Sequence, residues 1–211
     1  SGAAFDEARA AELDTVLAAA PDVLVIQDDH AGPIAGVDFV GLSCDRRRWA
    51  VVRSMAKSMG PDLRVALVVG DRTTVERVEA RLQIGPGWVS HLLQRTVATL
   101  LESPEAQAAV ERARSTYRRR RERLRDTLVA AGIPASSRSG LQVWVPVPDE
   151  QAVVMALLDA GFAVRGGDRF RLQSPPAIRI TTAALGDADI DRLASELVAI
   201  LAPGVPRSRT A

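Results

Sequence analysis

The residues RSMAKSMGPDLR, positions 53–64, combine the end of a predicted strand with a tight turn, and they contain Lys57. Lys57 is the only lysine among 27 lysine and arginine residues, which leaves 26 arginines (27 − 1 = 26). A lysine amine can lose its proton and form an imine with a carbonyl group, whereas a guanidinium stays charged. Small residues and the Gly60-Pro61 turn leave room for a ligand beside this amine. The alternative is an ordinary surface lysine.

The residues around Lys57 favour the first interpretation. Arg64 follows the turn and can direct a guanidinium at an anion such as phosphate. Ser54 adds a hydroxyl, and the segment VLVIQDDH places Asp28, Asp29 and His30 at the end of a strand predicted to be buried on both faces. Ligands of open parallel sheets lie beyond the carboxyl ends of the strands. An amine, a phosphate clamp and a carboxylate at one sheet edge fit pyridoxal 5′-phosphate (PLP).

The composition is that of an ordinary globular protein. The 211 residues allow one large or two small domains, and the net charge of +1 selects neither nucleic acid nor an anionic membrane. Cys44 is the only cysteine, so no internal disulfide forms, and we expect a reducing, cytoplasmic location. No signal peptide, membrane-spanning stretch or metal-ligand spacing is recognisable, so we expect neither a metal site nor a membrane partner.

Two patterns follow each other along the chain. Through residue 102, helices predicted at 6–19, 71–83 and 89–101 alternate with strands at 23–29, 49–55 and 64–70, which is typical of a parallel α/β sheet. A long helix at 103–131 is predicted to bridge two domains. Residues 132–202 then suit a small α+β domain, with strands at 141–147, 162–167 and 177–183 and helices at 149–160 and 187–201. We expect a mobile tail over 203–211.

The long helix carries the basic run RRRRER, residues 118–123. A basic run can bind nucleic acid, but Glu122 and Asp126 are interleaved with the arginines, and we favour an exposed helix face.

The segment SMAKSMGPDLR resembles the lysine segment of fold-type I, class I/II aminotransferases. Its Gly-Pro-Asp-Leu-Arg form, together with Asp-Asp-His-Ala-Gly upstream, is especially similar to the aminotransferase-like domain of MocR/GntR-type transcriptional regulators. GWVSHLLQR, GLQVWVPV and AIRITTA also resemble stretches of that family. The resemblance implies the C-terminal part of a PLP-binding large domain with a mostly parallel sheet, residues 1–102, followed by the interdomain helix and the small domain.

The resemblance also implies roles for individual residues. Lys57 would form the internal aldimine with PLP, and Asp28 would pair with the pyridine nitrogen. His30 stands where most relatives have a tyrosine that contacts the ring oxygen, which puts the usual tuning in doubt. Ser54 and Arg64 would hold the phosphate, and Arg179 would bind the α-carboxylate of an amino acid. Ser90 would approach the phosphate of a partner subunit in a homodimer.

Several alternatives remain open at this point. The chain is either an effector-sensing domain, which recognises an amino acid or another amine, or a genuine aminotransferase. Ser54-x-x-Lys57 also matches the acyl-enzyme motif of β-lactamases, but with one lysine the chain has no Lys-Thr-Gly. The family's upstream phosphate loop, stacking aromatic ring and winged-helix DNA-binding domain are absent from these residues. We therefore expect a C-terminal portion that binds PLP poorly alone and contacts DNA only through a domain outside this chain.

Overall fold

The computed structural model of the protein describes residues 2–42 and 46–202. The chain divides into two compact units, one formed by Ala4–Ser115 and the other by Thr116–Ala211 with Ser1–Ala3. The division falls within the long helix α5 (Pro104–Ala130), which the sequence pattern predicted at 103–131. Domain boundaries at residues 102 and 131 stay a prediction. The expectations for Cys44 and for the tail at 203–211 concern residues outside the described ranges.

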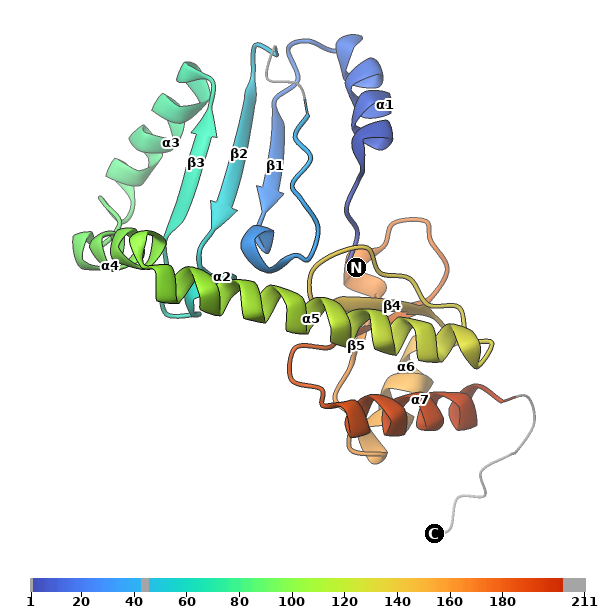
Figure 1. The fold of residues 1–211 in the computed structure, drawn as a ribbon. Coiled ribbons are helices and arrows are strands. Elements are labelled where there is room, and N and C mark those ends of the chain that lie inside the picture. Colours follow the sequence, from blue (N-terminus) through green and yellow to red (C-terminus); the bar gives the residue numbers. More distant parts are fainter. Residues whose placement is uncertain (1, 43–45, 203–211) are drawn as a thin grey trace. The chain divides into compact units, whose positions relative to one another are not determined.

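The first unit contains a small sheet with helices around it (Figure 1). Its elements, in chain order, are α1 (Glu7–Ala18), β1 (Val25–Asp29), the 3-10 helix η1 (Gly32–Ile34), β2 (Trp49–Ser54), α2 (Ala56–Met59), β3 (Ala66–Gly70), α3 (Arg72–Ile84), α4 (His91–Glu102) and the start of α5.

The sheet has the strand order β1-β2-β3 and mixed directions. β1 and β2 are parallel, with Asp28 opposite Val52 and Asp29 opposite Arg53. β3 runs antiparallel to β2. The reversal has a simple cause: only the short segment 55–65 joins these two strands, and a parallel return needs a crossover of a dozen or more residues. The pattern of helices and strands did not signal this reversal.

One face of the sheet is only partly covered, in contrast to the expected burial of β1 on both faces. The side chains of β1 alternate between half-buried and exposed, and Ile26 is 60% exposed. Helix α3 packs against β3 and β2, while β1 lies at the edge of the sheet. An apolar hollow of about 630 Å³, lined among others by Ile26, Val52 and Val68, lies on this face beside α3. The described chain therefore leaves apolar sheet surface exposed.

The helix starts follow the capping signals in the sequence. Asp6, Asp71 and Asp149 each accept a backbone N–H from the first turn of α1, α3 and α6 (Glu150–Asp159). Asp71 also accepts the N–H of Trp49 at 2.8 Å, so it joins the start of α3 to β2. Hydrogen bonds from Thr74 and from the Trp49 N–H lower the pKa of the Asp71 carboxyl. The predicted helix at 71–83 is thus confirmed by its cap.

The second unit is an antiparallel sheet packed on one face by helices. Its strand order is β4-β6-β5, formed by β4 (Gln142–Pro146), β6 (Ala177–Thr181) and the short β5 (Arg165–Gly166). The final helix α7 spans Asp187–Leu201, as the periodicity predicted. The core side of this unit is built from fully buried apolar side chains of the sheet and helices, among them Leu124, Leu128, Val143, Val145, Leu157, Ile178, Ile190 and Leu197.

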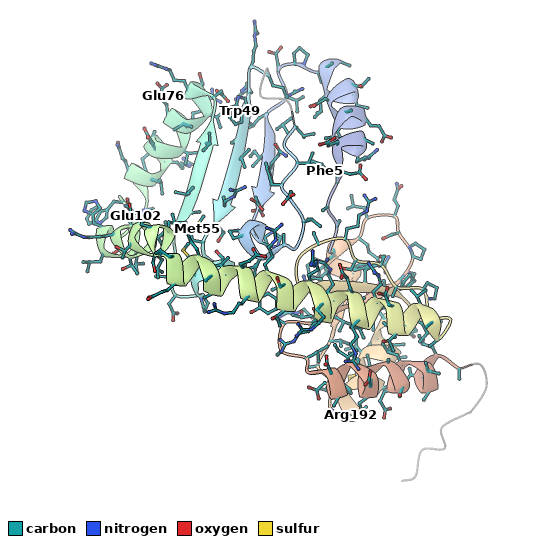
Figure 2. All side chains as sticks on the ribbon, in the orientation of Figure 1. Phe5, Trp49, Met55, Glu76, Glu102 and Arg192 are labelled. Atoms are coloured by element: carbon teal, nitrogen blue, oxygen red, sulfur yellow. The ribbon has the colours of Figure 1, made fainter. Side chains whose placement is uncertain are left out.

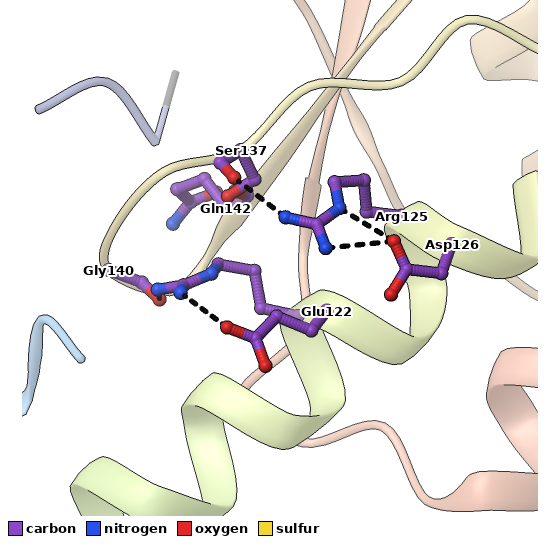
Figure 3. Close-up of polar contacts among 7 residues, drawn as sticks. Glu122, Arg125, Asp126, Ser137, Gly140 and Gln142 are labelled. Carbon is purple, nitrogen blue, oxygen red and sulfur yellow. Dashed lines mark hydrogen bonds and ion pairs between the residues drawn. The ribbon is translucent and has the colours of Figure 1, made fainter. Parts of the chain in front are cut away.

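The basic run of α5 is only partly the exposed face that the sequence predicted: Arg118 and Arg119 are exposed, but the second half of the run packs against the protein. Arg121 is only 2% exposed. Its guanidinium donates to the carbonyl oxygen of Gly140 at 3.2 Å and lies 3.5 Å from a carboxylate oxygen of Glu122 (Figure 3). Arg123 pairs with Asp187 at 3.0 Å and with Asp191 at 2.8 Å. The run therefore ties α5 to the loop before β4 and to α7.

Among the described residues, no helix combines the length and the apolar character that crossing a bilayer requires.

Candidate functional site

The carboxyl ends of β1 and β2 bring the first candidate residues together. Because the two strands are parallel, both end at the same edge of the sheet (Figure 1). Paired residues of neighbouring strands share a face, so Asp28 lies on the face of Val52, and Ser54 lies on that face two residues further along. The edge therefore collects Asp28, Ser54 and the short helix α2 that follows β2.

Asp28 and Asp29 have different environments, although both were expected to face one crevice. Successive side chains of a strand point to opposite faces. Asp29 is the buried member: its side chain is 9% exposed, and Arg53 Nε donates to its Oδ2 at 2.6 Å. The Arg53 guanidinium also lies 5.4 Å from the centre of the Phe39 ring. Asp28 is exposed and forms no ion pair among the described residues. Asp29 is therefore a structural residue, and Asp28 is the carboxylate available to a ligand.

Helix α2 orients Lys57 by burying its neighbours. Met55, at the end of β2 (Figure 2), is 2% exposed and belongs to a small core with Val65 and Val97. Met59, one helical turn after Met55, packs against the same core. Lys57 lies between these two methionines in the sequence and is exposed. The methionines anchor the helix, and the amine faces away from that core.

A turn closed by a backbone hydrogen bond brings the chain around Arg64 back beside the start of α2. The N–H of Met55 donates to the carbonyl oxygen of Val65 at 3.0 Å, which closes the segment between them. Gly60 makes the reversal with φ of +125° and ψ of 144°, a conformation that side chains rarely adopt. Arg64 is exposed, like Lys57, and neither has an ion-pair partner among the described residues. Two free cations therefore share one small loop.

The remaining candidates of this unit have less distinctive positions. Ser54 is half-buried, and its hydroxyl accepts the N–H of Ala56 at 3.3 Å. His30 is exposed directly after β1. Ser90 accepts the N–H of Leu93 at 3.5 Å and caps α4, which gives it a structural role.

Arg179 belongs to the second unit, and its orientation is now defined. Its neighbours Ile178 and Ile180 are buried in the core, so Arg179 occupies the opposite face of the sheet. Its Cζ lies 4.1 Å from the centre of the Phe170 ring. Its Nε is buried without a hydrogen-bond partner in the described chain. Burial and, secondarily, the charge of Arg165 lower the pKa of the Arg179 guanidinium, so an anion at this position would relieve both.

One expectation from the sequence differs from the structure. We expected the amine of Lys57 to be buried, but Lys57, Asp28, His30 and Arg64 are all exposed. The cause is visible in the described residues: the edge where β1 and β2 end is bordered by α2 and by η1, which packs against α2, and these short elements do not cover the four side chains.

Known proteins resemble this chain over nearly its whole length. The family model for aminotransferase class I and II matches residues 2–197. The vitamin B6 salvage pathway transcriptional repressor PtsJ of Salmonella typhimurium is 36% identical over 200 residues, which cover 93% of this chain and 46% of the repressor.

Solved structures show the same fold. An aspartate aminotransferase variant of Thermus thermophilus superposes with a TM-score of 0.81 at 21% identity, covering 95% of this chain and 57% of the enzyme. An aromatic aminotransferase of Pyrococcus horikoshii gives a TM-score of 0.84 at 19% identity, covering 95% and 56%. The predicted fold class is therefore confirmed. The chain spans about half the length of the relatives that it matches.

Proposed function

Because the chain belongs to the aminotransferase class I and II family, a family that uses PLP, we propose that it is the PLP-binding, effector-sensing part of a MocR/GntR-type transcriptional regulator. Lys57 is the residue that binds PLP through its ε-amino group, and an amino acid or another amine is the effector. The regulator assignment is supported by the 36% identity to a transcriptional repressor. We place the protein in the cytoplasm as a homodimer and assign DNA contact to residues outside this chain.

The residues of the first unit divide the binding of PLP among them. Arg64 and Ser54 would hold the phosphate, Asp28 would keep the pyridine nitrogen protonated, and His30 would contact the ring oxygen. When bound, PLP supplies an electron sink for the bonds at the carbon that carries the amino group. Lys57 would bind, release and rebind the cofactor carbonyl and hold the proton that moves at that carbon.

The structure fits this division at several points. The carboxylate at the Asp28 position is free while its neighbour Asp29 is paired with Arg53. Lys57 and Arg64 lie in one loop closed by the hydrogen bond from the Met55 N–H to the Val65 carbonyl oxygen, and both side chains are exposed. Two unpaired cations and a carboxylate at one sheet edge, within one unit, are the observation that carries the proposal. A phosphate provides the counter-charge that this arrangement lacks.

Arg179 would bind the carboxylate of the effector. Its guanidinium is held by the Phe170 ring and has a buried Nε without a partner among the described residues. A carboxylate fits such a group because it can accept two parallel hydrogen bonds from it.

The second candidate function is a class I/II aminotransferase, which transfers an amino group between an amino acid and a 2-oxo acid. The superposition on aspartate and aromatic aminotransferases favours it. The same residues would serve both functions. The rate at which the complete protein transaminates amino acids distinguishes an aminotransferase from a regulator.

Reduction of the complete protein with borohydride in the presence of PLP, followed by peptide mapping, tests the cofactor assignment. We expect a pyridoxyl adduct on Lys57, which is the only lysine in this sequence. Lys57→Arg, which keeps the charge but cannot form an imine, serves as the control and should remove the adduct. An unmodified Lys57 under these conditions would refute the assignment.

Two further measurements separate the candidate functions. A regulator binds specific DNA with an affinity that changes when the amine is added, and it turns over amino acids slowly or not at all. Steady transamination of several amino acids without DNA binding would favour the aminotransferase.

A further inference from the structure

A second arginine lies beside Arg179 on the outer face of the small sheet. β5 pairs antiparallel with β6, and Arg165 is directly opposite Arg179 in the register. Directly opposite residues share a face, with Cβ atoms about 5 Å apart. Trp144 of β4 is opposite Arg179 on its other side. The outer face thus presents Trp144, Arg179 and Arg165 in a row across its three strands.

The two arginines have no acidic partner in the described part of the chain. Neither forms an ion pair there. The nearby carboxylate of Glu150 is already occupied: it accepts from Arg171 Nε at 2.8 Å and from the N–H groups of Asp168 and Ala177 at 2.9 and 3.0 Å. Like charges opposite each other in a sheet are destabilising. A site that retains such a pair is suited to a ligand that neutralises both charges.

We propose that Arg165 is a specificity-determining residue that binds a second acidic group of the effector or substrate, so that the preferred ligand carries two anionic groups. The proposal rests on the proposed function, in which Arg179 binds the first carboxylate. Arg179 is half-buried and held against Phe170, which suits the first carboxylate, the group that all ligands share. Arg165 is exposed on the edge strand, which suits the second acidic group, the one that differs between ligands. The second group is a carboxylate or a phosphate.

Binding of small acids to the complete protein tests the pair independently of the cofactor. Glutarate carries two carboxylates, and glutaramate replaces one of them with a neutral amide of the same shape; neither has an amine that reacts with PLP. Titration calorimetry on the Lys57→Arg protein should show glutarate binding about tenfold more tightly than glutaramate, the value of one charge-assisted hydrogen bond. O-phospho-L-serine against L-serine, on the same protein, tells whether phosphate is the better second group.

Substitutions then locate the preference. Arg165→Gln should abolish the difference between glutarate and glutaramate, Arg165→Lys should restore part of it, and Arg179→Gln should weaken both acids. The control is Arg119→Gln, an exposed arginine of the same unit on α5, which should leave the preference intact. Three results would overturn the proposal. The preference for glutarate could survive Arg165→Gln, or that substitution could weaken the binding of both acids equally. Neither acid could bind to the Lys57→Arg protein that has both arginines.

The unfolding midpoint of each variant, followed by circular dichroism, checks that Arg165→Gln folds. Because this substitution removes a like-charge repulsion, we expect no decrease of the midpoint without ligand, and a loss of the stabilisation that glutarate gives. If borohydride leaves Lys57 unmodified while the Arg165-dependent preference persists, the cofactor assignment fails and the arginine pair stands. A Lys57 adduct without the preference refutes the pair alone.

Discussion

Arg53 Nε lies 2.6 Å from Asp29 Oδ2, and this ion pair joins the end of β1 to the end of β2. It distinguishes two adjacent aspartates that the sequence presents as equivalent. Asp29 is committed to the protein itself, because its carboxylate is almost buried and its partner is fixed further by the Phe39 ring. Asp28 points to the other face of the sheet, where Ser54 also lies. One residue therefore maintains the strand ends, and its neighbour is available to a ligand.

Asparagine substitutions of the two aspartates should affect different properties: one should lower stability and the other should weaken cofactor binding. Asp29→Asn removes the charge that Arg53 pairs with, and we expect it to lower the free energy of unfolding by about 1–2 kcal/mol, since Arg53 itself is partly exposed. Asp28→Asn should leave stability unchanged and weaken PLP binding by the complete protein at least about tenfold, because the pyridinium loses its counter-charge. Urea unfolding and cofactor titration of both variants check this. Equal effects of the two substitutions on PLP binding would contradict the distinction.

Gly60 allows a second test, of the turn that places Arg64. A Cβ at Gly60 would meet no atom within 4 Å, so the only obstacle to a side chain is the backbone conformation, with φ of +125°. We expect Gly60→Ala to destabilise the protein by about 1–3 kcal/mol and to weaken PLP binding, because the turn must change shape. Gly186→Ala is the control: its φ of −79° and ψ of 172° are extended backbone that any residue adopts, and the nearest atom to a Cβ there is Asp189 Oδ2 at 3.4 Å, an ordinary contact. A neutral Gly60→Ala would show that the turn tolerates another geometry.

The sequence predicted the elements well wherever local signals decide them. Asp71 and Asp149 marked helix starts because their carboxylates accept backbone N–H groups from the first turn. The alternation of LQVWVPV marked β4, and the spacing of apolar residues from Asp187 to Leu201 marked α7. Helix caps and apolar periodicity involve residues only a few positions apart, so they can be recognised in a single sequence.

The sequence could not predict features that depend on tertiary neighbours. The antiparallel direction of β3 depends on the length of the connection after β2. The burial of the β1 side chains depends on which elements pack against the two faces of the sheet. The pairing of Asp29 with Arg53, separated by 24 positions, leaves no local signal. The position of Arg165 opposite Arg179 was also missed, although the strand pattern around FAVRGG and AIRITTA contains it once the register is known.

The basic run on α5 gives a third prediction. Arg121 is buried, whereas Arg118 and Arg119 are exposed on the same helix. We expect Arg121→Ala to lower the free energy of unfolding by about 2–4 kcal/mol, because it removes packed surface and the bond to Gly140, and leaves a cavity in the second unit. The double substitution of Arg118 and Arg119 by glutamine should change stability by less than about 0.5 kcal/mol. Denaturant unfolding of both proteins distinguishes the roles, and a larger loss of stability in the double variant than in Arg121→Ala would contradict the structural role of Arg121.

Glu150 gives a prediction about pH. Burial acts to raise the pKa of this carboxyl, but hydrogen bonds from the Ala177 N–H, the Arg171 side chain and the Asp168 N–H outweigh it and lower the pKa below its ordinary 4.5. A carboxyl with a lowered folded-state pKa binds protons more readily when the chain unfolds. Its contribution to stability is therefore complete above about pH 4.5 and is lost as the pH falls through the lower, folded-state value.

Glu150→Gln should accordingly flatten the acid side of the stability curve. We expect the variant to be less stable than the parent protein at about pH 6 and the difference to shrink steadily toward about pH 3, because protonation removes the same charge from the parent protein. Asp159→Asn, at the exposed end of the same helix α6, is the control for a simple change of net charge. Urea midpoints followed by circular dichroism across this range make the comparison. A difference between parent and Glu150→Gln that stays constant with pH would mean that the shape of the side chain, rather than its charge, joins α6 to Arg171 and β6.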